Sequence, residues 1–92
     1  MTLEARIEKC LVQYYQGKEQ RLAYRLSKLY LVLAQRSIPD QERVLSAGYE
    51  CLYWLKIAGY VPGVVLADCR PDEIKYLLRQ FIKCAAGRKI GA

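Results

Sequence analysis

Residues 18–36 read KEQRLAYRLSKLYLVLAQR, and this stretch decides the fold class. Its apolar positions recur at intervals of three and four residues, which is the spacing of one face of an α-helix. The stripe consists of Leu22, Leu26, Leu29 and Leu33. Most of the other residues in the stretch are strong helix formers. We therefore predict a long amphipathic helix over residues 18–36.

The segments on both sides of this stretch show the same helical periodicity. Thr2 is a favoured N-cap for a first helix, and Gly17 is a favoured place for that helix to end. Ser37 and Asp40 have the spacing of a capping box, in which two side chains satisfy the first free amides of a helix. We therefore predict a third helix over residues 38–58, ended by the glycine that follows.

The last third of the chain is less regular. Residues 60–63 have the composition of a turn, and residues 64–67 fit a short helix better than a strand because no second strand is available for pairing. Pro71, followed by two acids, favours the start of a last helix. With 92 residues and 53% apolar character, the chain can form one modest core. We expect an all-α, compact bundle of four to five short helices, a single domain over residues 1–92 with a frayed tail at 87–92.

Several residues are candidates for the core. Trp54 and Phe81 are predicted to be buried. Gly48 lies inside the third predicted helix at a cost of about 1 kcal/mol relative to alanine, which is tolerable if another helix crosses closely there. The cysteines show no closely spaced pair of the kind that zinc sites use, so buried thiols are favoured over a metal site or disulfides. These cysteines are Cys10, Cys51, Cys69 and Cys84.

The composition argues against most enzyme classes. The absence of histidine removes Ser-His and Cys-His nucleophile pairs and every zinc site that contains histidine. No glycine-rich phosphate loop is present. We therefore expect no catalytic residue, no cofactor, no metal and no small-molecule substrate. Since no apolar stretch approaches the roughly 20 residues that span a bilayer, we expect a cytoplasmic protein without a membrane association.

Positive charge is concentrated in particular parts of the chain, whose net charge is +6. Residues 1–36 carry seven cations and three acids, and residues 71–92 carry five cations and two acids. Residues 37–70, in contrast, carry three cations and four acids. The excess therefore lies on the first, second and last predicted helices.

Within these helices the cations form rows at helical spacing. Like charges at i,i+4 destabilise a helix by about 0.2–0.5 kcal/mol per pair, so rows without interspersed acids favour a polyanionic partner. A tyrosine beside the last row could stack on a base or contact a phosphate. The predicted nucleic-acid contacts are Lys18, Arg21, Arg25, Lys28, Lys75, Arg79, Lys83 and Tyr76.

Two functional hypotheses follow from these features. The first is a non-enzymatic module that binds the phosphate backbone of nucleic acid without base specificity, as a subunit of a larger assembly. The alternative is a protein–protein interaction module, meaning an adaptor, a chaperone or a self-assembling subunit, whose tyrosines form an interface and whose basic rows meet an acidic protein. Both imply a homo- or hetero-oligomer. A solubilising basic face and structural tyrosines are the simpler explanation of the same residues.

Overall fold

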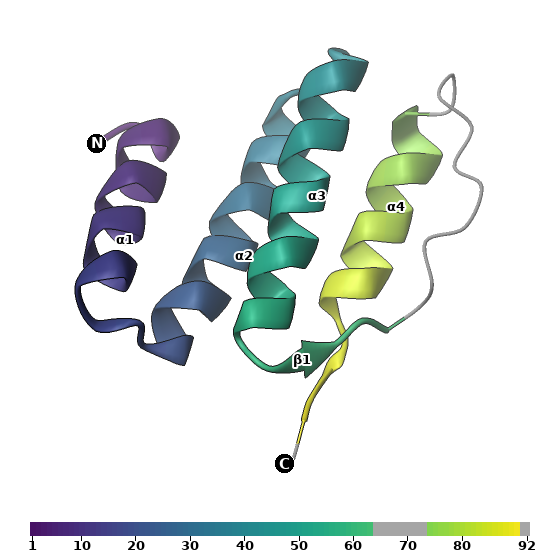
Figure 1. The fold of residues 1–92 in the computed structure, drawn as a ribbon. Coiled ribbons are helices and arrows are strands. Elements are labelled where there is room, and N and C mark those ends of the chain that lie inside the picture. The colour runs from purple at the N-terminus through teal and green to yellow at the C-terminus, as the bar shows by residue number, and fades with distance from the viewer. Residues whose placement is uncertain (64–73, 91–92) are drawn as a thin grey trace.

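The computed structural model describes residues 1–63 and 74–90 of the chain. Within these residues the structure is mostly helical, with a small two-stranded sheet near the C-terminus. The elements are α1 (Leu3–Gly17), α2 (Gln20–Arg36), α3 (Gln41–Ile57), β1 (Tyr60–Val61), α4 (Ile74–Ala85) and β2 (Arg88–Lys89). The helices stand side by side in chain order, and α2 packs against each of the other three (Figure 1). None of them combines the length and the apolar character needed to cross a membrane.

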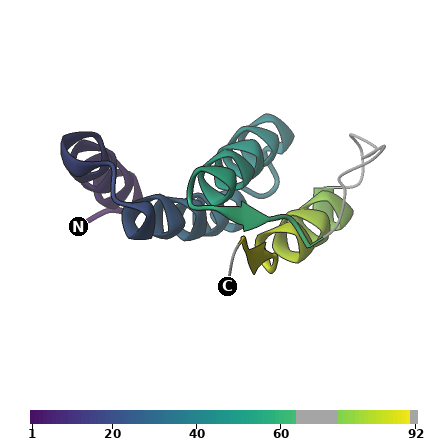
Figure 2. The ribbon, with the colours of Figure 1, turned by 60° about the horizontal axis from the view of Figure 1, so that its bottom comes forward.

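The helices form a thin slab. In Figure 2, α1 and α3 lie on one side of the molecule, whereas α2 and α4 lie on the other. The principal-axis extents are 39 × 34 × 14 Å. Because the slab is so thin, α2 and α3 each keep one side turned away from the core, and these two sides face in opposite directions.

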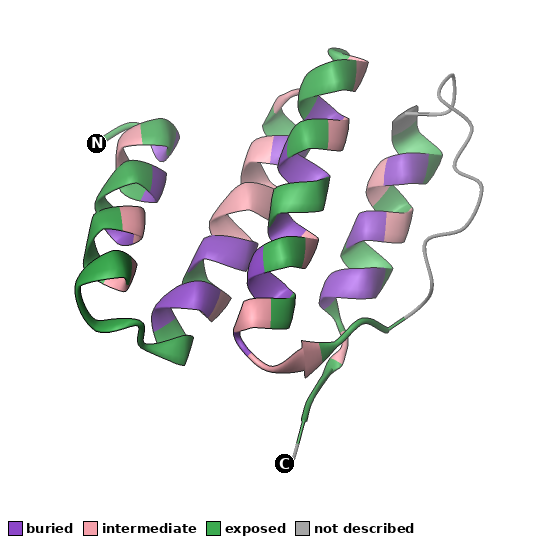
Figure 3. Cartoon of the chain, in the orientation of Figure 1, coloured by how far each residue is buried: buried purple, intermediate pink, exposed green. Residues whose placement is uncertain are grey.

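The main core lies where α1, α2 and α3 meet. Trp54 on α3 is almost fully buried there, as predicted, and its ring meets that of Tyr14 on α1 edge-on, with centroids 4.9 Å apart. The first half of the predicted leucine stripe is buried, but Leu29 and Leu33 are only half-buried because they border grooves between the helices (Figure 3). The buried cluster comprises Leu3, Ile7, Cys10, Leu22, Ala23, Leu26, Trp54 and Ala58.

The start of α1 confirms the predicted cap, whereas α2 begins two residues later than predicted. The Thr2 hydroxyl oxygen accepts a hydrogen bond from the Ala5 amide at 3.1 Å, as expected of an N-cap. α1 ends at Gly17, but the left-handed cap position that follows is taken by Lys18, with φ of 54°. A residue in this conformation cannot continue a helix, so α2 begins at Gln20 rather than at residue 18.

The predicted capping box between α2 and α3 is wrong. The Ser37 hydroxyl donates backwards to the Leu33 carbonyl at 2.6 Å, which ties it to the end of α2. Asp40 is itself the N-cap of α3, and its carboxylate accepts a hydrogen bond from the Arg43 amide at 3.3 Å. The intervening Pro39 disfavours helical geometry at the residue before it, so α3 begins after the proline rather than at residue 38.

The C-terminal end also corrects the sequence predictions. Residues predicted as a turn form β1, in which Tyr60 pairs with Lys89 and Val61 with Arg88 in antiparallel register. The Ile90 amide donates to the Gly59 carbonyl at 2.6 Å, so residues 88–90 are held and not frayed. Residues 64–67, the predicted helix start at Pro71 and residues 91–92 lie outside the described residues.

A second helix does cross closely at Gly48, which is the condition under which a glycine inside α3 is tolerable. Phe81 on α4 is fully buried, and a Cβ atom added at Gly48 on α3 would collide with its ring. Glycine thus allows the two helices to approach at this point. Leu77 shares the buried face of α4 with Phe81, whereas Ile82, the residue after Phe81, is 41% exposed.

We expect Gly48→Ala to lower the free energy of unfolding by about 1–2 kcal/mol. Alanine gains about 1 kcal/mol of helix propensity, but overpacking a filled core costs about 1–3 kcal/mol, and the collision with Phe81 puts this site at the upper end. Urea unfolding followed by circular dichroism measures the change. Gly17→Ala is the control, because its added Cβ would meet only a Glu19 carbon at 3.8 Å. A Gly48→Ala protein as stable as the wild type would contradict this packing.

Candidate nucleic-acid interface

The structure divides the predicted basic row of the second helix. Lys18 lies before α2, and its amino group stands 4.3 Å from the ring centroid of Tyr15. This is the geometry of a cation–π contact. Arg21 does lie on α2, but its Nε atom is 2.7 Å from an Oε2 atom of Glu19. The expectation that no acid accompanies the row is therefore wrong at Arg21.

Lys28 connects two helices. Its side chain is half-buried, its Nζ atom donates to the Ala85 carbonyl at 3.2 Å, and the same atom lies 4.9 Å from the Tyr24 ring centroid. Ala85 is the last residue of α4, so the ammonium group binds an orphan carbonyl at the negative end of that helix. Lys28 thus ties α2 to α4. Of the four predicted residues in this row, Arg25 alone is exposed and forms no ion pair, hydrogen bond or ring contact with a described residue.

The predicted row on α4 is a continuous exposed stripe. Lys75, Arg79 and Lys83 are all exposed at four-residue spacing, and Tyr76 beside them is 44% exposed. No ion pair to a described residue engages any of these cations. Their participation in binding stays a prediction.

A second concentration of positive charge, which the sequence did not reveal, lies between α1 and α2. Three adjoining hollows of about 310, 460 and 440 Å³ follow one another along these helices and share lining residues. We call them together the basic furrow. Its cations are Arg6, Lys9, Arg21, Arg25 and Arg36. Glu19, at one end, is the single acid among the lining residues.

The furrow owes its charge to residues on two different helices. Arg6 and Lys9 extend from the polar flank of α1, beside the buried Ile7 and Cys10. Arg25 comes from the facing flank of α2 and lines two of the three hollows. Neither Arg6, Lys9 nor Arg25 forms an ion pair within the described residues. The three-residue spacing of Arg6 and Lys9, which places them on one side of α1, is visible in the sequence. It does not show which flank of α2 lies opposite them.

Burial raises the pKa of two of the described cysteines. Burial raises the pKa of Cys10, which lines the furrow, although nearby Arg25 works in the opposite direction. Burial also raises the pKa of Cys51 to about 11, with Lys28 lowering it and Cys84 raising it. Cys10, Cys51 and Cys84 are buried as predicted, and Cys69 lies outside the described residues. Over the described ranges, no three Cys, Asp or Glu side chains are grouped as metal ligands.

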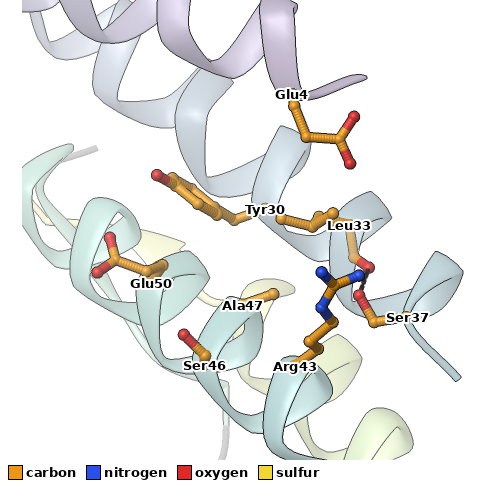
Figure 4. A pocket seen from close by; sticks show the side chains of 8 residues that line it. All are labelled: Glu4, Tyr30, Leu33, Ser37, Arg43, Ser46, Ala47 and Glu50. Carbon is orange, nitrogen blue, oxygen red and sulfur yellow. Dashed lines mark hydrogen bonds between the residues drawn. The ribbon is translucent and has the colours of Figure 1, made fainter. Parts of the chain in front are cut away.

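A smaller cleft of about 240 Å³ lies on the other side of α2, between α1 and α3. Figure 4 shows that Glu4 from α1, Tyr30 from α2 and Arg43 and Glu50 from α3 surround it. The Glu50 carboxylate accepts a hydrogen bond from the Trp54 indole at 3.2 Å. Burial is the largest cause that raises the pKa of Tyr30, and Glu50 and Tyr15 raise it further. The Tyr30 hydroxyl therefore remains a hydrogen-bond donor. With acids and a base together, this cleft has no preference for a polyanion.

The basic furrow is therefore the described surface best suited to an extended anion. Its guanidinium and ammonium groups can donate hydrogen bonds to phosphate or carboxylate oxygens, and arginine can do so with two parallel bonds. Leu29 and Val32 contribute apolar surface to its lining. Comparisons with protein-family models, curated proteins and solved structures found no match to this chain.

Proposed function

We propose that this chain is a non-enzymatic helical module that binds the phosphate backbone of nucleic acid through the basic furrow. The observation that carries the proposal is the alignment of five cations along one groove with a single acid at its end. Every nucleotide carries the same phosphate, so contacts to phosphates position the protein on the nucleic acid without distinguishing one base sequence from another. The proposed binding therefore has no base specificity.

The dimensions of the furrow suit a strand of nucleic acid. α1 has 15 residues, so the furrow beside it is about 22 Å long, which is enough for several consecutive phosphates of one strand. Arg25 stands near its middle, with Arg6 and Lys9 on the facing rim. The exposed stripe on α4 supplies a secondary contact at most, because no opposing wall of cations accompanies it. Lys18 and Lys28 are not proposed as contacts, since their amino groups already face rings or a carbonyl.

A protein–protein interaction module is the second candidate. The observation that favours it is an exposed tyrosine surface on α3, where Tyr49 and Tyr53 are each more than half exposed. In that case an acidic protein would occupy the basic furrow. The subunit role in a larger assembly belongs equally to both candidates.

Fluorescence anisotropy at about 50 mM salt, where phosphate contacts are strong, tests the proposal. Labelled single strands and duplexes of two unrelated sequences are titrated with the protein, and polyglutamate serves as an acidic polypeptide competitor. We expect equal affinity for the two sequences and weak competition by polyglutamate. No binding, or polyglutamate competing as well as unlabelled nucleic acid, would replace the proposal with the interaction-module alternative.

A further inference from the structure

The side of α3 that faces away from α2 carries a regular stripe, which we call the α3 seam. Its residues are Glu42, Leu45, Tyr49, Leu52 and Lys56. Their intervals alternate between three and four residues, which is the heptad spacing of helices that pack along one another. In Figure 3, exposed positions follow the side of α3 turned toward the viewer. No described helix covers this stripe completely, since Glu42, Tyr49 and Lys56 are all exposed.

The centre of the seam is apolar and packs against a buried ring of α4. Tyr49 is 55% exposed, yet its ring rests edge-on against buried Phe81, with centroids 5.6 Å apart. Beside it, Tyr53 is 53% exposed, and a hollow of about 560 Å³ separates these rings from exposed Val61 and Ile90. Contiguous exposed apolar surface of this kind marks interaction sites, and tyrosine is enriched in them.

The charges at the two ends of the seam complement each other. Glu42 lies in the first turn of α3 and Lys56 in the last. Neither forms an ion pair with any residue that the structure describes. A seam with one acid and one base offers no attraction to a polyanion. It is complementary to itself, however, when the second helix runs in the opposite direction.

We propose that the α3 seam binds a second copy of this chain, with the two α3 helices antiparallel about a two-fold axis at Tyr49. Counting outward from Tyr49, Glu42 then faces the partner subunit's Lys56, and symmetry repeats this pair. Leu45 faces the partner subunit's Tyr53 in the same register. A parallel arrangement would set Glu42 against the partner subunit's Glu42, and like charges destabilise such contacts.

This dimer is compatible with the proposed nucleic-acid binding but does not depend on it. The basic furrow contains residues of α1 and α2 and the segments that flank them, whereas the α3 seam contains residues of α3 alone. Both surfaces can therefore be occupied at the same time. The dimer would carry two furrows.

Sedimentation velocity over protein concentrations of about 1–200 μM, the range of weak to moderate association, tests the dimer. We expect the wild type to approach twice the chain mass of 10.6 kDa as concentration rises. Glu42→Lys and Lys56→Glu should each weaken the dimer roughly tenfold or more, because each replaces two attractive pairs with two repulsive ones. The double variant Glu42→Lys/Lys56→Glu should restore it. Tyr49→Asp should leave a monomer.

The double variant separates association from folding. Each charge reversal also opposes the dipole of α3, so a fault in folding would be worse in the double variant than in either single one. Restored association cannot then be a folding effect, and circular dichroism confirms the helix content of each variant. Glu8→Lys, an equal charge change at an exposed position on α1, should leave the dimer unchanged. A monomeric wild type at the highest concentration, or no restoration in the double variant, would overturn the proposal.

Discussion

Phe81→Ala is expected to lower the free energy of unfolding by about 3–5 kcal/mol, the cost of deleting a large buried aromatic side chain. Phe81 is completely buried and lies directly against Gly48 on α3, so its truncation leaves a cavity where the two helices meet. A domain of this size has a total stability of roughly 5–15 kcal/mol, so this loss is a large part of it. Urea unfolding monitored both by circular dichroism and by the fluorescence of Trp54 measures the loss.

Ile82→Ala is the matched control on the same helix. Ile82 is 41% exposed, so its truncation removes less buried surface and leaves no closed cavity. We expect a loss of about 1 kcal/mol or less, as is usual for surface substitutions. Equal losses for Phe81→Ala and Ile82→Ala would mean that α4 does not pack on α3 through Phe81.

The triple change Arg6→Gln, Lys9→Gln and Arg25→Gln is expected to weaken nucleic-acid binding about 10- to 100-fold. Exposed charge pairs contribute roughly 0.2–1 kcal/mol each, and three aligned contacts in one groove lie at the upper end of that range. None of the three side chains forms an ion pair within the described residues, so the substitutions leave no buried charge without a partner. Anisotropy titration at fixed low salt measures the change, and circular dichroism verifies that the fold is retained.

A second triple variant on α4 controls for net charge. Lys75→Gln, Arg79→Gln and Lys83→Gln also remove three positive charges from the net +6. These residues lie on the exposed face of one helix rather than around a groove. We expect this variant to lose only about threefold in affinity, through weaker long-range attraction. An equal or larger loss for the α4 variant would show that nucleic acid binds the predicted stripe on α4 rather than the furrow.

Periodicity was enough to predict the helices, but their ends depended on more than the local sequence. The leucine spacing in residues 18–36 identified α2, and the structure moves its start by two residues because Lys18 adopts a left-handed conformation. Thr2 acts as the predicted cap, while Ser37 does not, since Pro39 separates it from α3. Residue type limits where a helix can begin, and neighbouring backbone geometry then selects among the possible positions.

Features formed by segments far apart in the chain could not be predicted in this way. The pairing of Tyr60 with Lys89 involves strands of two residues, which are too short to show any alternation. In the sequence, Lys28 belongs to a row of surface cations. Its contact with the carbonyl at the end of α4 is visible only once the two helices are packed together. The basic furrow likewise requires the relative rotation of α1 and α2, which charge spacing on either helix does not contain.

The salt dependence of binding to a labelled single strand tests the central claim most directly, because it counts the phosphates that the furrow neutralises. The four furrow cations other than ion-paired Arg21 predict a slope of log K against log salt of about −3, at about −0.7 per phosphate on single strands. The Arg6→Gln/Lys9→Gln/Arg25→Gln variant should retain a slope of about −1 on the same basis. A slope near zero for the wild type, or the same slope for both proteins, would contradict phosphate binding in the basic furrow.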